Sequence, residues 1–224
     1  MSARERILQR LASAESRSPL PLPDVAAYYA AHQRNEDAAA RLVRFRTAIA
    51  AAHAEVHDTD DAGWPALLCR IAIEKRLRSL LVGGDTADAG TLASQSQLPF
   101  ALRSYDSAAP GWRNELFTAI DAGLTRAKSA IAETGSLVLW PDSREPRLMS
   151  LVPPVHFVLL DTRCIHADLH GAMTAEDWSS TLPTNALLIS GPSKTADIQQ
   201  TLAYGAHGPR ELVVLLCHPT GAQS

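Results

Sequence analysis

Cysteine is scarce in this chain. Cys69, Cys164 and Cys217 are the three cysteines among 224 residues, an odd number set far apart. Cysteines so spaced form neither a paired disulfide framework nor the C-x-x-C pair that commonly holds a metal or an iron–sulfur cluster. We therefore expect no cofactor within this chain, and in particular no cluster.

Long apolar runs are also missing, although apolar residues make up 46% of the sequence. No segment approaches the length of a membrane-spanning helix, and residues 1–10 are charged where a secretory signal would need an apolar stretch. The formal net charge of -3 comes from scattered ions, so it gives no general attraction to nucleic acid or to an anionic membrane. The sequence predicts a cytoplasmic protein with no nucleic-acid partner and no membrane span.

Three familiar catalytic or metal-binding patterns are absent. There is no Gly-x-Ser-x-Gly elbow of a serine hydrolase. The pair Lys194-Thr195 follows the single Gly191 and lacks the wider glycine spacing of a Walker A loop. Cys164, His166 and His170 could suggest a metal site, with the two histidines four residues apart on a helix face, but no glutamate follows His166 and no fourth ligand is near in sequence. We therefore expect no metal site.

The hydrophobic pattern predicts an N-terminal arm followed by one domain. With 224 residues and a mass of 24.1 kDa, the chain is long enough for one α/β domain but short for two. Residues 1–23 are expected to form a helical arm over 2–12 and then a Ser/Pro-rich linker that cannot continue the helix. Residues 24–224 are expected to form the single domain.

Within that domain, helical and strand patterns alternate. Thr134-Gly135 is a turn pair that permits positive φ at the glycine, so residues 129–133 and 136–140 are predicted to form a β-hairpin. Residues 155–160 and 212–216 are almost wholly apolar rather than alternating, as strands covered on both faces require. The prediction is an α/β fold with a helix-covered, largely parallel sheet. The other predicted helices are 35–56, 64–76, 115–120, 175–180 and 195–204, and the other strands are 79–82, 99–102 and 186–189.

The segment Ser190-Gly-Pro-Ser-Lys-Thr-Ala-Asp197 is the first candidate site. A short apolar run leads into this turn, and the predicted helix 195–204 would leave several free N–H groups at its start. Ser193, Lys194, Thr195 and Asp197 are therefore candidate ligands for a small anion, such as a phosphate, a carboxylate or a thioester oxygen. The alternative is a plain helix cap, in which the hydroxyls bond the free N–H groups and no ligand binds.

Three further residues are candidates for chemistry. Glu133, beside the hairpin turn, would serve as a general base or acyl acceptor, or else bond local N–H groups as a turn carboxylate. His207, in the loop that ends the predicted helix, would carry a proton, or else be a structural loop residue. Arg147 would clamp a carboxylate with two hydrogen bonds, or else be a solvated charge.

Four motifs together resemble the lactate-utilization (LUD) domain family. They are Ala132-Glu-Thr-Gly135, Ser150-Leu-Val-Pro-Pro154, Ser190-Gly-Pro-Ser-Lys-Thr-Ala-Asp-Ile198 and His207-Gly-Pro209, in the order in which the family has them. The resemblance is specific over residues 119–216. It implies a fold similar to that of ribose-phosphate isomerase, glucosamine-phosphate deaminase and the coenzyme A transferases, some of which use a loop carboxylate in catalysis.

The resemblance also implies a function. It points to a part in the bacterial oxidation of L-lactate to pyruvate, with this chain as a cluster-free accessory subunit and the iron–sulfur clusters in partner proteins. It leaves open whether this chain is itself an enzyme. Two alternatives stand beside it: a free-standing enzyme acting on a phosphorylated sugar or an acyl-coenzyme A thioester, and a purely structural assembly protein that docks through Ile7, Leu8 and Leu11 of the arm.

Overall fold

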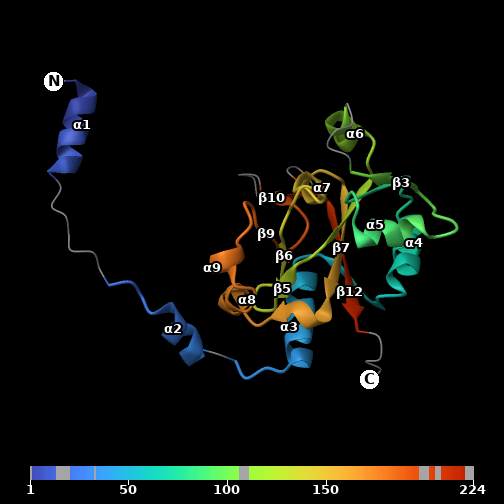
Figure 1. Cartoon of the computed structure of the whole chain (residues 1–224), viewed down its shortest axis with the longest axis horizontal. Helices are drawn as coiled ribbons and strands as arrows, with labels where there is room; N and C mark the ends of the chain where they lie inside the picture. The colour runs from blue at the N-terminus through green and yellow to red at the C-terminus, as the bar shows by residue number, and fades with distance from the viewer. Residues whose placement is uncertain are drawn as a thin grey trace. The chain divides into compact units, whose positions relative to one another are not determined.

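The computed structural model describes residues 2–13, 21–32, 34–105, 111–196, 202–204 and 208–219 (Figure 1). The chain divides into two compact units, Met1–Asn35 and Glu36–Ser224. The first unit extends beyond the predicted arm, which ended at residue 23. Among the described residues, no helix combines the length and the apolar character needed to cross a membrane.

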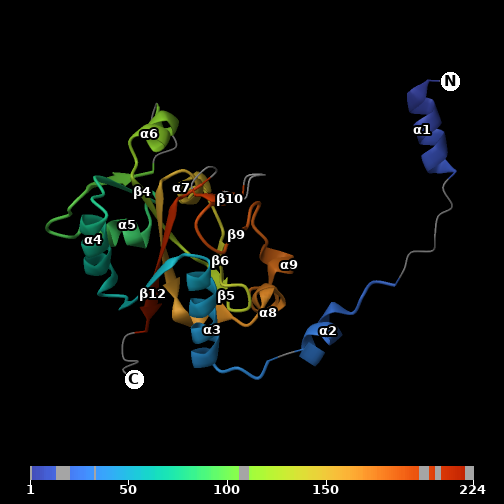
Figure 2. The same cartoon turned by 180° about the vertical axis from the view of Figure 1, so that it is seen from behind.

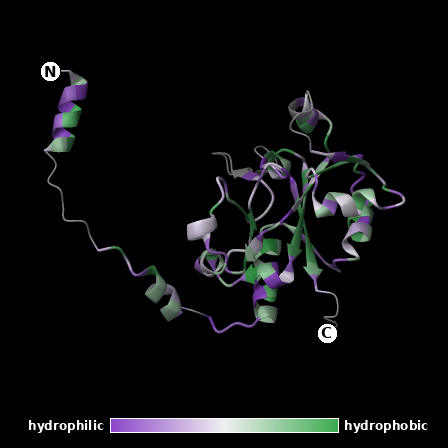
Figure 3. Ribbon diagram, viewed as in Figure 1, coloured by the Kyte–Doolittle hydropathy of each residue, from purple (hydrophilic) through white to green (hydrophobic). Residues whose placement is uncertain are grey.

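The described residues of the first unit include helices α1 (Ala3–Ala12) and α2 (Val25–His32). Helix α1 confirms the predicted helix over residues 2–12. It begins with a capping box, in which the Glu5 N–H donates to Ser2 Oγ at 3.2 Å and the Ser2 N–H donates to Glu5 Oε2 at 2.7 Å. Its large apolar side chains are exposed. The ribbon in Figure 3 shows hydrophobic and hydrophilic residues alternating along the helix.

A parallel sheet forms the centre of the second unit. Its order is β1-β12-β7-β4-β2-β3, and every pairing described within it is parallel. Figure 3 shows apolar residues concentrated in the central strands. The predicted α/β fold with a largely parallel sheet is therefore confirmed. The strands are β1 (Glu55–Asp60), β2 (Ser79–Val82), β3 (Ala101–Ser104), β4 (Ala122–Arg126), β7 (Val155–Asp161) and β12 (Glu211–His218).

Helices α4 (Trp64–Glu74) and α5 (Ala87–Ala93) cover one face of this sheet (Figures 1 and 2). Leu68 and Ile71 of α4 are fully buried against residues such as Phe157 of β7. Because alternate residues of β7 point to opposite faces, Phe157 packs under the helices while Val158 packs on the other side.

The other face is covered by helix α3 (Ala38–Ala51) and by a second sheet of order β8-β5-β6-β9. Phe45 and Ile49 of α3 are fully buried, in a core cluster that includes residues of both sheets. The second sheet has β5 (Ser129–Ile131), β6 (Ser136–Leu139), β8 (Ile165–His166) and β9 (Leu187–Ile189). The remaining elements are α6 (Trp112–Thr118), α7 (Leu148–Leu151), the 3-10 helix η1 (Thr162–Cys164), α8 (Leu169–Ala175), α9 (Trp178–Thr181), β10 (Lys194–Ala196) and β11 (Leu202–Tyr204).

The predicted hairpin is confirmed by the antiparallel pair β5 and β6. Gly135 in its turn has φ 62°, a conformation that favours glycine. A Cβ at this position would also lie 2.5 Å from the Ile49 backbone nitrogen of α3. The turn therefore needs glycine both for its backbone angle and for its contact with the helix.

Two predicted helices are wrong in extent or in kind. The helix predicted for residues 35–56 ends at Ala51, and Val56 lies in β1, which pairs with β12. The helix predicted for residues 195–204 is not present as predicted: Lys194–Ala196 pairs antiparallel with Leu202–Tyr204. In both places a helical spacing of few apolar residues is a weak signal, and strand pairing satisfies the backbone groups instead.

Smaller differences concern short elements. Strands β4 and β8 were not predicted, and the helix predicted at 175–180 is replaced by α8 and α9, with Asp177 between them at φ 49°. His166 lies in β8 whereas His170 lies in α8, so the two histidines do not share one helix face. Among the described residues, no group of three or more His, Cys, Asp or Glu is placed to hold a metal ion.

Candidate functional site

Segments from three of the four sequence motifs meet around one pocket of about 220 Å³, which we call the motif pocket. Ser150 and Leu151 line it from α7, residues 188–193 from the end of β9 and the loop that follows, and Gly208-Pro209 from the entry to β12. His156 of β7 and Leu212 of β12 complete the lining. The motifs that carry the family resemblance are thus close in space, although they are far apart in sequence.

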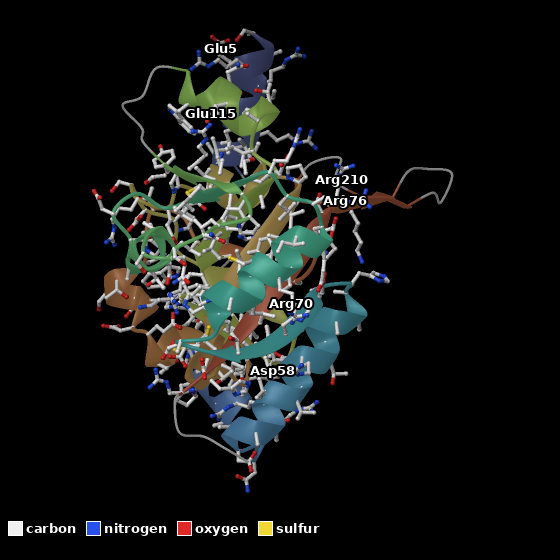
Figure 4. The ribbon with its side chains drawn as sticks, turned by 90° about the vertical axis from the view of Figure 1, so that its right-hand side faces the viewer. Glu5, Asp58, Arg70, Arg76, Glu115 and Arg210 are labelled. Atoms are coloured by element: carbon white, nitrogen blue, oxygen red, sulfur yellow. The ribbon has the colours of Figure 1, made fainter. Side chains whose placement is uncertain are left out.

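Main-chain hydrogen bonds hold these segments together. The Ser193 N–H donates to the Pro209 carbonyl at 2.8 Å, and the Arg210 N–H donates to the Pro154 carbonyl at 2.8 Å. His156 and Leu212 are register partners near the starts of β7 and β12. In Figure 4, Arg76 and Arg210, which precede β2 and β12, lie toward one end of the sheet, and Asp58 of β1 lies toward the other. The motif pocket is therefore at the amino-terminal edge of the sheet, whereas open α/β sheets usually bind ligands at the carboxyl edge.

His156 is the most unusual residue of the pocket. Its side chain is completely buried, and its Nε2 lies 2.9 Å from the Thr125 hydroxyl of β4. Its Nδ1 has no hydrogen-bond partner among the described residues. Burial lowers the pKa of His156 to about 3, so the imidazole is neutral at pH 7.

Hydroxyl groups link the remaining motif, Ala132-Glu-Thr-Gly135, to the pocket. Thr134 Oγ1 lies 2.7 Å from Ser136 Oγ, which in turn lies 2.7 Å from Ser190 Oγ. The loop after Ser190 approaches the end of α3 so closely that a Cβ on Gly191 would lie 2.7 Å from the Ala52 carbonyl oxygen. The hairpin turn and this loop are therefore fixed relative to each other and to α3.

Only part of the predicted anion-binding segment, residues 190–197, lies at the motif pocket. Ser193 lines the motif pocket, but Lys194 is exposed on β10, outside the pocket lining. Because β10 replaces the predicted helix start, no helix N-terminus stands behind Ser193, Lys194 and Thr195. The side chain of Thr195 is not described, and Asp197 and His207 lie outside the described residues.

Arg147 and Glu133 lie outside the motif pocket lining as well. Arg147 is exposed at the start of α7 and lines a recess of about 10 Å³ that shares Ser150 with the pocket. Glu133 is exposed just after β5, and its N–H donates to the Ala167 carbonyl at 3.1 Å. The structure therefore does not bring Glu133, Arg147 and Ser193 into one site.

The recess lies beside a charged cluster at the carboxyl ends of β2 and β4. Arg126 donates to both carboxylate oxygens of Asp88, at 2.9 and 2.6 Å. Burial raises the pKa of Glu145 to about 7, and the nearby Asp88 and Asp142 carboxylates act in the same direction. Glu145 is thus able to exchange a proton near neutral pH. A recess of this volume has room for little more than one water molecule.

Sequence reasoning missed the pairing of Thr125 with His156. A signal was present, because His156 is the one strongly polar residue in the apolar run 155–160. A histidine retained inside a fully buried strand needs hydrogen-bond partners, so its position pointed to a polar pocket or to a buried partner.

Comparisons with known proteins agree with the motif resemblance. Residues 42–217 match the model of the LUD domain. An uncharacterized protein of Neisseria meningitidis serogroup B is 41% identical over 227 residues, which cover 98% of this chain and 95% of that protein. A lactate utilization protein C from an Exiguobacterium species is 30% identical over 120 residues, and the alignment spans only 51% of each protein.

A solved structure shows the same fold. The crystal structure of a DUF162 family protein from Deinococcus radiodurans aligns with a TM-score of 0.60 and 20% identity. The alignment covers 81% of this chain and 99% of that one.

Proposed function

Because this chain belongs to the LUD domain family, we propose that it is a cluster-free accessory subunit of a bacterial system that oxidises L-lactate to pyruvate. The match to the LUD domain over residues 42–217 is the observation that carries the proposal. The partial similarity to a lactate utilization protein C supports it in the same direction. The convergence of the sequence motifs on one pocket supports a shared site within the family.

The redox centres of this system would belong to iron–sulfur partner proteins. The chain has three single cysteines, and Cys217 is buried within β12. Burial raises the pKa of Cys217 to about 11, which keeps its thiol protonated and unsuited to bind a cluster. A small anion, such as the carboxylate of lactate or pyruvate, would bind at the exposed Lys194 beside Ser193.

The proposal is tested by assembly and electron transfer. A tagged copy of this chain is purified from its native host, and co-purifying proteins are analysed for iron and acid-labile sulfide. Lactate-dependent electron transfer is then measured in a strain that lacks the chain and in the same strain complemented with it. We expect association with iron–sulfur proteins and a loss of electron transfer that complementation restores. Unchanged activity together with no association would contradict the proposal.

A free-standing enzyme is the second candidate, favoured by the motif pocket and its buried histidine. Its substrate would be a phosphorylated sugar or an acyl-coenzyme A thioester. A ligand that binds only the native state raises the melting temperature. Stabilisation by such compounds, with none from lactate or pyruvate, would therefore favour this function over the first.

A structural assembly protein is the third candidate, favoured by the apolar side chains on α1. Ile7, Leu8 and Leu11 are 61%, 55% and 67% exposed. If these side chains dock on a partner, deletion of residues 1–23 should abolish association and leave residues 36–224 folded. The matched control replaces Arg4 and Arg10 of the same helix with alanine, which should leave association intact.

A further inference from the structure

We propose that a second pocket binds a free α-amino acid with an apolar side chain. This pocket has a volume of about 270 Å³ and lies where α6 meets the strands β2 and β3, and we call it the α6 pocket. Among the described residues, it shares no lining residue with the motif pocket. Its volume is at the lower end of the range for ligand pockets, which suits a small molecule. The inference does not depend on a role in lactate oxidation.

The floor of the α6 pocket is apolar. Leu81 of β2, Leu116 of α6 and Ile120 line it, and all three side chains belong to one buried cluster. Leu81 points away from α4, because its neighbours Leu80 and Val82 pack in the core cluster that contains residues of α4. The pocket therefore lies on the face of the sheet opposite α4, and an apolar group that enters it leaves water for an apolar surface.

One wall of the pocket is aromatic and held in place by hydrogen bonds. The rings of Tyr105 and Trp112 meet edge to face, with their centroids 5.0 Å apart. The Tyr105 N–H donates to the Val82 carbonyl at 2.9 Å, and the Ser79 hydroxyl donates to the Ala119 carbonyl at the end of α6 at 2.7 Å. Both sides of the pocket are thus tied to β2. Aromatic walls of this kind favour a side chain that carries a ring.

Two opposite charges lie at the same pocket. Arg103 of β3 and Glu115 of α6 both line it, and Arg103 Nε lies 3.4 Å from Glu115 Oε1. Their side chains are 57% and 49% exposed, so a ligand can reach both. An exposed ion pair contributes little to stability, and a ligand that separates the two charges therefore loses little. Apart from these two and the Tyr105 phenol, no ionisable side chain is among the described residues that line the pocket.

This pair of charges selects a zwitterion. A lone carboxylate would be attracted by Arg103 but repelled by Glu115, and for a lone ammonium group the two forces are reversed. An α-amino acid carries both groups on one carbon. Its carboxylate can face Arg103 while its ammonium group faces Glu115, and its side chain then lies on the apolar floor. A neutral polar group would form weaker hydrogen bonds with both residues, because only one partner of each bond is charged.

The test compares five probes on the full chain. L-phenylalanine has both charges and a ring. 3-Phenylpropionate lacks the ammonium group, phenethylamine lacks the carboxylate, N-acetyl-L-phenylalaninamide has the ring but neither charge, as within a peptide, and L-alanine lacks the ring. Ligands of this size bind with dissociation constants in the millimolar range, so binding is followed by NMR up to roughly 20 mM.

The expected order of affinity follows from the pocket. L-phenylalanine should bind about 5-fold more tightly than each singly charged probe, the upper end for one partly exposed ion pair, and should exceed the neutral probe by more. L-alanine should bind at least about 10-fold more weakly than L-phenylalanine, because it buries no ring. L-phenylalanine should also shift the indole ¹H–¹⁵N signal of Trp112, which Trp112→Phe identifies by removing it.

Three variants complete the test. Arg103→Gln should weaken L-phenylalanine binding by about 5-fold and leave phenethylamine, which has no carboxylate, bound no more weakly. Glu115→Gln should weaken L-phenylalanine by a similar factor and leave 3-phenylpropionate bound no more weakly. Arg70→Gln is the matched control. Arg70 also pairs at 3.4 Å, with Glu74, and the two side chains are 61% and 58% exposed, but both residues lie outside the pocket lining. This control should change no affinity.

Three results would overturn the proposal. Equal binding of L-phenylalanine and of either singly charged probe would show that one of the two charges is not recognised. Binding of N-acetyl-L-phenylalaninamide as tight as that of L-phenylalanine would assign the pocket to a side chain of a protein partner instead of a free amino acid. A Trp112 indole signal that does not move with L-phenylalanine would exclude the pocket. Failure of the lactate-oxidation assay would leave these readouts unaffected, so the two proposals fail separately.

Discussion

Acid should destabilise the second unit through His156. Its pKa is lowered from 6.5 to about 3 because the folded protein buries the ring completely. Between these two values the unfolded chain binds a proton that the folded protein does not accept. The stability that the neutral ring contributes is therefore fully present above pH 6.5 and is lost as the pH falls toward 3.

The size of the effect follows from the two pKa values. Because the unfolded chain binds this proton with a pKa of 6.5, the free energy of unfolding falls by about 2 kcal/mol at about pH 5. Once the pH is below both pKa values, the loss reaches about 5 kcal/mol. The loss at about pH 5 is the one to measure, because below about pH 5 the carboxylates that pair in the folded protein also begin to titrate.

The assay is urea unfolding of the wild type and of His156→Leu, each at about pH 7 and about pH 5. His156→Leu should lose about 2 kcal/mol less than the wild type between the two conditions, because it has no ring to protonate. His57→Phe is the control, since His57 is partly exposed and pairs with Glu55 at 2.7 Å on the surface of β1. An identical pH dependence in the wild type and in His156→Leu would refute the reasoning.

Three further predictions rest on other contacts. Burial raises the pKa of Glu145 from 4.5 to about 7, so the folded protein holds a proton that the unfolded chain releases as the pH rises from 4.5. Urea unfolding should therefore find Glu145→Gln more stable than the wild type by roughly 1 to 3 kcal/mol at about pH 8. This gain in stability should disappear at about pH 4. Gly191→Ala should destabilise the fold by roughly 1 to 3 kcal/mol because the added Cβ would lie 2.7 Å from the Ala52 carbonyl oxygen. Gly90→Ala in α5 should be neutral or stabilising, because a Cβ there has no atom within 4 Å. Equal melting temperatures for the two variants would contradict this account. If an anion binds at Lys194, Lys194→Ala should weaken its binding by roughly 1.5 to 3 kcal/mol, and added salt should weaken its binding to the wild type. The melting temperature should change little, because Lys194 is exposed. Calorimetric titration with pyruvate measures the two changes in binding.

Local patterns were sufficient wherever an element has a strong signal of its own. The hairpin around Gly135 was predictable because a positive φ is a local property of the turn. Strands β7 and β12 were predictable because a strand buried on both faces is composed mainly of apolar residues, with His156 the exception in β7. Helix α4 was predictable from apolar residues at helical spacing, among them Leu68 and Ile71, that face one core.

Elements stabilised by distant partners could not be read from local patterns. Strand β1 exists because residues 55–60 pair with β12, more than 150 residues further along the chain. The segments Lys194–Ala196 and Leu202–Tyr204 look helical in isolation, but they form a strand pair. The spacing of apolar residues within a short segment does not indicate which strand it will pair with, since hydrogen bonds between strands depend on how the whole chain folds.

The candidate site shows the same division. The sequence determined which segments carry the family resemblance, and it identified Ser193 as a candidate. Only the tertiary structure decided that these segments surround one pocket and that Glu133 and Arg147 lie outside its lining. It also revealed the pairing of Thr125 with His156, 31 residues apart in sequence. The physical reason is that burial and hydrogen-bond partners set the chemistry of a side chain, and both arise only when distant segments pack together.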